Sequence, residues 1–303
     1  MTAPGEPATP AGDTQPVPPP TGRRRSAGRD LPAAIAVGVA AVVYVVVTLV
    51  WWHWGFILLV ALALSLGSIE VHQALRRIGM NAAIVPIVIG TVAMIVGTYA
   101  AAVRATWWHM PWHSVLLMYL GATVLASLIV RFPRGHEGFV RDAAASVFII
   151  GYIALLGSFT ALILAGENGS ARMVTFLLCV VGNDTGGYIA GVLFGKHPMA
   201  PKISPKKTWE GFVGSMVLSI VVGVLMCVFA LGAPWWVGVL IGAAMVFFGT
   251  CGDLIESSIK RDVGIKDMSS ILPGHGGVMD RLDSLLVAAA PAWLVMYLLI
   301  PGG

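Results

Sequence analysis

Long apolar runs are the feature that most constrains how this chain folds. A helix needs about 20 mainly apolar residues to cross the hydrocarbon core of a bilayer. Only 11% of the residues are charged and the mean hydropathy is +0.84, whereas soluble domains carry about 25% charged residues. The sequence therefore predicts an all-α fold, a polytopic integral membrane bundle of about nine transmembrane helices. The predicted spans are Leu31–Val50, Trp52–Ile69, Ala82–Val103, Ser114–Val130, Ala144–Ala165, Met173–Phe194, Phe212–Leu231, Trp235–Thr250 and Ser284–Ile300.

The basic residues indicate how these helices are oriented. With nine spans, all but Arg104 and Arg172 of the 19 lysines and arginines fall on the side that holds the N-terminus. Cytoplasmic segments are enriched in Lys and Arg, so we expect a multi-pass protein of the cytoplasmic membrane with its N-terminus in the cytoplasm and its C-terminus outside. The basic residues flank apolar runs and do not form a patch with interleaved aromatic side chains, which argues against a nucleic-acid partner.

The chain divides into a polar tail and a membrane domain. Residues 1–30 are rich in Pro, Thr, Gly and Ala and end in an arginine cluster. Such a composition cannot offset its ordering entropy by burial, which predicts a disordered cytoplasmic tail with a basic anchor. Residues 31–303 are expected to form one transmembrane catalytic domain. Two of its cytoplasmic loops, 195–211 and 252–283, are polar and interrupted by glycine and proline, so we expect the chemistry there.

Acidic residues in the second loop have a spacing that suits a cation. Asp253 and Glu256 would share one face of a helix with Lys260, and Asp280 and Asp283 repeat the same three-residue spacing. A lone acidic pair in a loop is usually a solvated surface pair. Here the acids lie at the membrane end of a predicted helix, where burial is costly unless they are paired or coordinated. Carboxylate oxygens favour hard cations, so the pattern predicts Mg²⁺ shared with phosphate oxygens.

The first loop, "GKHPMAPKISPKKTWEG", has the side chains of a phosphate clamp. Its lysines alternate with Pro201 and Pro205, and hydroxyl groups lie between them. Anchoring to the membrane surface is the alternative interpretation, although anchoring does not need the prolines. The P-loop motif is absent from the sequence. The side chains suited to bind a polyphosphate are Lys202, Ser204, Lys206, Lys207 and Thr208.

Two acids lie inside or at the end of apolar runs. Asp184 falls within the sixth predicted span, and an intramembrane carboxylate is a functional candidate by default. Glu70 lies at the predicted cytoplasmic end of the second span. It is either a functional acid or the partner of Arg76 and Arg77 in an interfacial ion pair.

One string near the C-terminus has a counterpart in a known family. "SSIKRDVGIKDMSSILPGHGGVMDRLD", Ser257–Asp283, resembles the signature of the phosphatidate cytidylyltransferases, the CDP-diacylglycerol synthases. "FGKHPMAPKISPKKTWEG" is similar to a second segment of that family. The resemblance covers the chain from about Leu31 to the C-terminus. The matching signature positions are Ser257, Lys260, Arg261, Lys266, Asp267, His275, Gly276, Gly277, Asp280, Arg281 and Asp283.

The resemblance implies that the protein transfers CMP from CTP to phosphatidic acid, forming CDP-diacylglycerol and releasing pyrophosphate. It implies Mg²⁺, with a second monovalent or divalent cation, held by Asp253, Asp280 and Asp283; Asp184 and Glu256 are additional candidates for the site. The residues to which it gives catalytic roles are Lys260, Arg261, Lys266, Asp267, His275 and Arg281. Those to which it gives contacts with CTP or phosphate are Lys202, Ser204, Lys206, Lys207, Thr208 and Glu210.

Two other functions fit part of the sequence. A CTP-dependent lipid kinase would share the membrane spans and a basic loop, but it would transfer phosphate, and the complete signature argues against it. A transporter would place its acids near the membrane midplane and would not need proline-ordered lysines. The expected partners are CTP, phosphatidic acid, membrane lipid and a second copy of the chain in a homodimer.

Overall fold

A computed structural model describes residues 31–103, 110–269, 271 and 276–301. The predicted disordered tail and the predicted catalytic residue His275 lie outside these residues, so both stay predictions.

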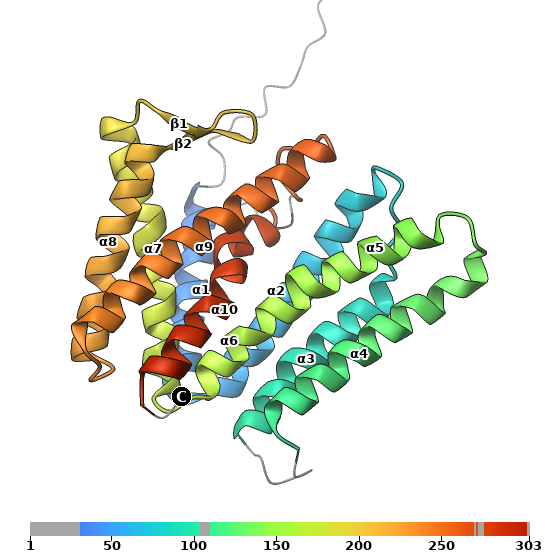
Figure 1. The fold of residues 1–303 in the computed structure, drawn as a ribbon, viewed down its shortest axis with the longest axis horizontal. Coiled ribbons are helices and arrows are strands. Elements are labelled where there is room, and N and C mark those ends of the chain that lie inside the picture. The colour runs from blue at the N-terminus through green and yellow to red at the C-terminus, as the bar shows by residue number, and fades with distance from the viewer. Residues whose placement is uncertain (1–30, 104–109, 270, 272–275, 302–303) are drawn as a thin grey trace, which may run out of the picture.

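Helices make up nearly all of the described chain, as the sequence predicts (Figure 1). A π-helical turn, Ile150–Leu155, joins α5 and α6 into one continuous rod, so that each predicted span has a helical counterpart. Eight of these rods are long and apolar enough to cross a membrane; the apolar part of α1 with described side chains, Gly38–Trp51, is shorter. The chain is a polytopic membrane protein. The helices are α1 (Leu31–Trp51), α2 (His53–Arg76), α3 (Ile84–Val103), α4 (Trp112–Arg131), α5 (Phe139–Ile149), α6 (Leu156–Ala165), α7 (Gly169–Phe194), α8 (Trp209–Phe229), α9 (Trp235–Asp262) and α10 (Met279–Leu299).

Helix α9 extends beyond its predicted membrane span, in agreement with the helix face predicted for Asp253, Glu256 and Lys260. The predicted span ends at Thr250, but the helix continues to Asp262, so the first part of the predicted 252–283 loop is helical. The apolar run does end at that point. The helix continues because Glu256 and Lys260 form a pair four residues apart, and basic residues in its last turn suit the helix dipole. It ends before Gly264, whose φ of +72° favours glycine.

The predicted loop 195–211 contains the β-structure of the described chain. Strands β1 (Pro198–Ala200) and β2 (Ser204–Thr208) pair as an antiparallel hairpin. The Thr208 side chain then accepts a hydrogen bond of 3.1 Å from the Gly211 amide and so caps α8. Lys206 and Lys207 therefore lie on a strand of a hairpin and not on an open loop.

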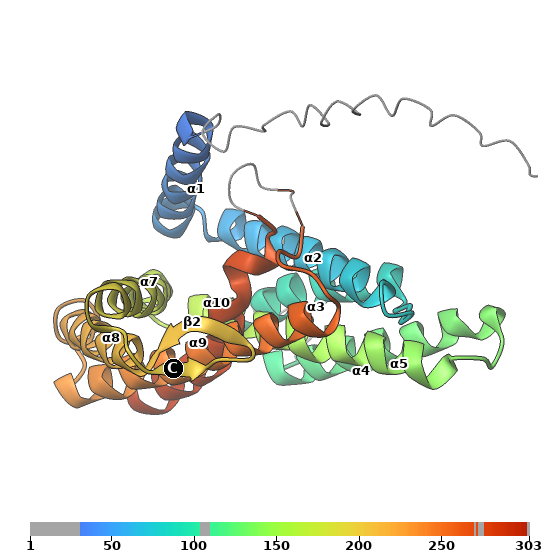
Figure 2. The same ribbon diagram turned by 90° about the horizontal axis from the view of Figure 1, so that it is seen from above.

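The helices form two groups that meet in the middle of the bundle. In Figure 1, α7, α8 and α9 lie on one side, α3, α4 and α5 lie on the other, and α2, α6 and α10 lie between them. Figure 2 shows α1 standing apart from the rest of the bundle, beside the start of α2. The hairpin lies at the opposite end of the molecule from the C-terminus (Figure 1).

Small residues allow the helices that carry the site to approach closely. A Cβ atom at Gly186 of α7 would come within 2.5 Å of the Gly214 carbonyl oxygen of α8, and one at Gly252 of α9 would overlap the carbonyl oxygen of Asp283. Close approach through glycine is typical of helix pairs in membranes. The contact at Gly252 brings the acidic segment of α9 against the acidic start of α10.

Arg172 is one of the two basic residues on the sparsely charged side, and the structure explains its position. Its guanidinium donates hydrogen bonds to the carbonyl oxygens of Glu167, Met296, Ile300 and Pro301 at 2.8 to 3.4 Å. It is 3% exposed. Arg172 therefore caps the C-terminal end of α10 by donating to carbonyl groups there, which gives it a structural role.

Candidate active site

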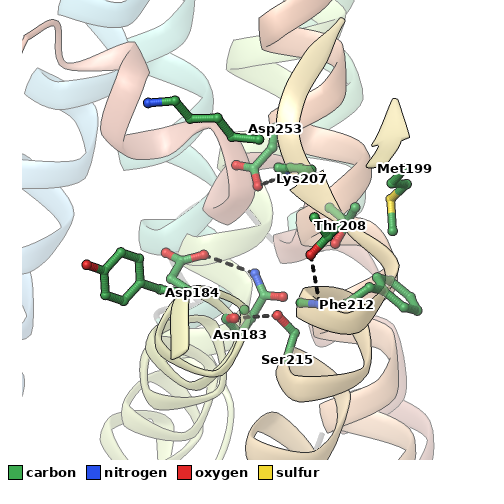
Figure 3. A pocket seen from close by; sticks show the side chains of 13 residues that line it. Asn183, Asp184, Met199, Lys207, Thr208, Phe212, Ser215 and Asp253 are labelled. Carbon is green, nitrogen blue, oxygen red and sulfur yellow. Dashed lines mark hydrogen bonds and ion pairs between the residues drawn. The ribbon is translucent and has the colours of Figure 1, made fainter. Parts of the chain in front are cut away.

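A polar cavity of about 250 Å³ lies between the hairpin and the helices α7, α8 and α9 (Figure 3). The hairpin contributes Lys206 and Lys207, and the helices contribute Asp184 and Asp253. The two polar segments that the sequence analysis identifies therefore meet in space. The complete lining is Asn183, Asp184, Gly187, Tyr188, Met199, Lys206, Lys207, Thr208, Gly211, Phe212, Ser215, Thr250 and Asp253.

A second cavity, of about 580 Å³, has one apolar side and one charged side. Residues of α1 and α7 form the apolar side, and the ends of α9 and α10 supply the charged groups. Asp184 and Asp253 line both cavities and so stand at the border between them. The complete lining is Ala41, Val42, Val45, Val46, Leu177, Val180, Val181, Asp184, Asp253, Asp280, Arg281, Asp283, Ser284 and Leu285.

Asp253 links the hairpin to α10. One carboxylate oxygen forms an ion pair with the Lys207 ammonium group, and the other accepts a hydrogen bond of 2.6 Å from the Ser284 hydroxyl. Its carboxyl group also interacts directly with that of Asp283. Asp184 lies below it (Figure 3), where the Asn183 amide donates to its carboxylate at 3.0 Å.

Lys260 organises the rest of the acidic segment. Its ammonium group lies 2.6 Å from a Glu256 oxygen and 2.6 Å from an Asp280 oxygen. Asp280 also accepts hydrogen bonds from the backbone amides of Gly277, at 2.7 Å, and Met268, at 3.2 Å. The Asp280 carboxylate therefore fixes the loop between α9 and α10.

Glu70 is a site residue whose role sequence reasoning left open. It is not paired with Arg76 or Arg77. Its carboxylate accepts hydrogen bonds from the amides of Val278, at 2.9 Å, and Met279, at 2.7 Å, and from the Ser269 hydroxyl, at 2.5 Å. Glu70 is fully buried and caps the N-terminus of α10 from another helix. The available sequence signal was its place at the end of an apolar span, where an acid is costly without partners.

Several predicted site residues line neither cavity. Glu210 accepts hydrogen bonds from His197 and from the Lys196 amide, and the Arg261 guanidinium donates to the Ile203 carbonyl oxygen at 3.3 Å. Both contacts hold the hairpin in place. Lys260 and Glu256, which pair with each other, also line neither cavity, and the remaining predicted residues outside both are Lys202, Ser204, Lys266 and Asp267. Their predicted contacts with substrate stay predictions.

The oxygen-rich border of the cavities suits a hard cation. Within the described residues, no three or more His, Cys, Asp and Glu side chains form a group that could hold a metal ion, so the three predicted aspartates do not surround one point. Asp253 and Asp283 do adjoin each other. Nearby, the Glu256 Oε1 atom and the Tyr152 hydroxyl are buried without a hydrogen-bond partner among the described residues. Adjacent carboxylates beside unpartnered oxygens fit Mg²⁺ chemistry.

Comparison with known proteins shows the family of this chain. The family model described as "Cytidylyltransferase family" matches residues 32–299. The chain belongs to the cytidylyltransferase family. It is 41% identical over 290 residues to the phosphatidate cytidylyltransferase of Mycobacterium leprae, covering 90% of this chain and 89% of the relative. It is 40% identical over 287 residues to that of Mycobacterium bovis, covering 90% of each chain.

A third relative is similar to only about half of the chain. The phosphatidate cytidylyltransferase of Staphylococcus saprophyticus is 41% identical over 146 residues, which is 48% of this chain and 55% of the relative. By contrast, the cytidylyltransferase family match covers all the described helices apart from the first residue of α1. Both cavities of this family member therefore lie inside the matched region.

Proposed function

We propose that this cytidylyltransferase transfers CMP from CTP to phosphatidic acid, forming CDP-diacylglycerol and pyrophosphate. One observation carries the proposal. A lysine-lined polar cavity and a cavity with an apolar side share Asp184 and Asp253. A soluble nucleotide and a membrane lipid need two such environments that meet where the phosphates react. The relatives' name, phosphatidate cytidylyltransferase, agrees with this pair of substrates.

The cavity linings support a separate place for each substrate. Lys206 and Lys207 of the polar cavity neutralise the triphosphate of CTP, acting as point charges. The acyl chains of phosphatidic acid lie along the apolar side formed by α1 and α7, for example at Val42 and Val181. Arg281 lines the same cavity beside Asp280 and Asp283 and attracts the lipid phosphate.

The reaction depends on positioning of the substrates and neutralisation of their charge more than on covalent catalysis. An oxygen of the lipid phosphate attacks the α-phosphorus of CTP, and the bond from this phosphorus to the bridging oxygen breaks, so that pyrophosphate leaves. Asp253 and Asp283 would hold Mg²⁺, which would supply positive charge to the phosphate oxygens. Lys260 keeps Asp280 and Glu256 in place, and Asp280 in turn fixes the loop before α10. A second cation and a homodimer remain predictions.

The decisive experiment identifies the product released from CTP. Purified protein with CTP, phosphatidic acid and Mg²⁺ is expected to release pyrophosphate. Release of CDP would indicate a lipid kinase, and release of neither product would indicate a carrier.

In the same assay, Lys206→Ala should raise the KM for CTP about tenfold, because one charge-assisted contact is lost. Lys196→Ala is the control, since Lys196 lies on the same segment but lines neither cavity.

We further propose that the site faces the cytoplasm, where CTP is available. The hairpin and the basic ends of α2, α4 and α9 would then lie inside, in agreement with the positive-inside rule. A reporter that is active only outside the cytoplasm should give a signal when fused after Gly303 and none when fused near Gly195. The reverse pattern would contradict both the orientation and the side on which CTP binds.

A further inference from the structure

A third cavity, of about 560 Å³, lies away from the proposed reaction site. It is formed by the C-terminal ends of α2 and α4 and the N-terminal ends of α3 and α5, and it shares no lining residue with the other two cavities. The turn after α2 and the turn between α4 and α5 lie toward the upper right of Figure 1. The complete lining is His72, Arg76, Asn81, Ala82, Ala83, Ile84, Val85, Pro86, Val130, Arg131, Arg134, Glu137, Arg141 and Asp142.

A buried ion pair builds one wall of this cavity. The Arg131 guanidinium lies 2.7 Å from an Asp142 oxygen, and each side chain is 6% exposed. Arg131 also donates to the carbonyl oxygens of Gly135 and Glu137, at 2.9 and 2.6 Å. The other Asp142 oxygen accepts a hydrogen bond of 2.8 Å from the Asn81 amide. These contacts join α4, α5 and the start of α3. The charges of Arg131 and Asp142 neutralise each other.

The remaining charge in the cavity is positive. Arg76, Arg134 and Arg141 line it, are exposed, and form no ion pair with any described residue. Glu137 is the single acid left to oppose them, because Asp142 is neutralised by Arg131. Three arginines that line one cavity attract an anion with several acceptor oxygens, and phosphate is such an anion, which a guanidinium binds through paired hydrogen bonds.

Two further features prepare the cavity for an anion. The Arg141 guanidinium lies against Gly79 and Gly138, where a Cβ atom would come within 3.4 and 3.3 Å of its nitrogens; both glycines have positive φ, at +78° and +69°. Two tight turns therefore seat this side chain. The cavity also receives the N-terminal end of α3, whose first amides, at Ile84 and Val85, have no acceptor among the described residues.

The cavity also opens toward an apolar surface. Val85, Ile89 and Val130 are 65%, 65% and 51% exposed on α3 and α4. Val85 and Val130 line the cavity, and Ile89 follows Val85 one turn along α3. In a membrane protein such side chains contact acyl chains. A soluble phosphate makes no contact with this apolar surface. A phospholipid whose phosphate lies in the cavity can place its acyl chains against Val85, Ile89 and Val130.

We propose that this cavity binds the phosphate group of an anionic phospholipid from the surrounding bilayer. Basic pockets between transmembrane helices are suited to lipid headgroups. The site is separate from the one that holds phosphatidic acid as substrate, and it does not depend on the proposed activity. Because the ligand bridges the ends of α2, α3, α4 and α5, its binding should stabilise the folded protein.

The test measures lipid binding to the purified, delipidated protein by native mass spectrometry and thermal unfolding. Phosphatidylglycerol, a phosphodiester lipid that lacks the terminal phosphate of phosphatidic acid, is the probe; phosphatidylcholine and inorganic phosphate are the comparison ligands. We expect saturable retention of phosphatidylglycerol and a higher unfolding temperature. In Arg134→Gln/Arg141→Gln the affinity should fall at least about tenfold. Arg77→Gln, which removes a neighbouring exposed arginine outside the cavity, should bind as the wild type does.

Three outcomes would overturn the proposal. The double variant retains as much phosphatidylglycerol as the wild type, phosphatidylcholine binds equally well, or inorganic phosphate at millimolar concentration displaces the lipid. The third outcome would assign the cavity to a free anion. If the double variant does not fold, Arg134→Gln alone carries the test, because the Arg134 side chain is exposed and forms no hydrogen bond with another described residue. Unaltered binding in that single variant contradicts the proposal in the same way.

Discussion

Asp283→Asn is expected to lower turnover about a thousandfold while the bundle stays folded. Asp283 adjoins Asp253 at the border of the two cavities, where we propose that both carboxylates hold Mg²⁺. Asparagine preserves the shape but removes the charge that the cation needs. Such a loss corresponds to roughly 4 kcal/mol of transition-state stabilisation. Turnover measured over a range of Mg²⁺ concentrations checks the prediction, and excess Mg²⁺ should restore only part of the activity.

The metal-free protein gives a second test of the same assignment. Two adjacent carboxylates repel each other unless a cation or a proton lies between them. Without Mg²⁺, Asp283→Asn should therefore unfold at a temperature equal to or above that of the wild type. Adding Mg²⁺ should stabilise the wild type and not the variant. Equal stabilisation of both proteins by Mg²⁺ would show that Asp283 is not a ligand.

Asp280→Asn is the informative comparison, because the structure gives Asp280 a different set of contacts. Its carboxylate is paired with Lys260 and accepts two backbone hydrogen bonds. The substitution should lower turnover through a displaced loop and should destabilise the fold with or without Mg²⁺. If it behaves as Asp283→Asn does, the ion is held by Asp280 as well, as the family resemblance implies.

Glu70→Gln is expected to lower turnover about a hundredfold although Glu70 lines neither cavity. Its two carboxylate oxygens accept two hydrogen bonds from amides at the start of α10 and one from the Ser269 hydroxyl in the loop before it. Glutamine offers one acceptor oxygen and places an NH₂ group against a donor. A buried donor without a partner costs about 1 to 3 kcal/mol, and a shift of about 1 Å in a positioned group can cost a hundredfold in rate.

Two measurements separate positioning from general damage. Glu167→Gln is the matched control, since Glu167 is exposed at the other end of the bundle and its carboxylate forms no hydrogen bond or ion pair within 4 Å with a described residue. It should leave both turnover and stability unchanged. In Glu70→Gln, hydrogen exchange should increase in the amides of Val278 and Met279 and not in the hairpin. Normal turnover together with increased exchange would mean that the cap serves the fold alone.

The sequence by itself was sufficient for the architecture and for the family. Apolar runs of membrane length predict helices without reference to any neighbour, because a chain in lipid must satisfy its backbone hydrogen bonds within each segment. The signature string likewise needs no structure to be read. Hydropathy reports only where the apolar run of α9 ends, whereas the spacing of Asp253, Glu256 and Lys260 predicts a helix beyond it, and α9 does continue through the Glu256–Lys260 pair.

The tertiary structure decided which of the candidate side chains act together. The sequence pattern predicts Asp253 and Asp280 equally as metal ligands. The close approach at Gly252 places Asp283 beside Asp253. Lys260, in contrast, forms ion pairs with both Asp280 and Glu256. Glu70 lies 208 residues from Val278 along the chain, so no local pattern can connect them. Contacts of this kind depend on how helices cross, and crossing is set by the small residues and the buried polar groups of both partners at once.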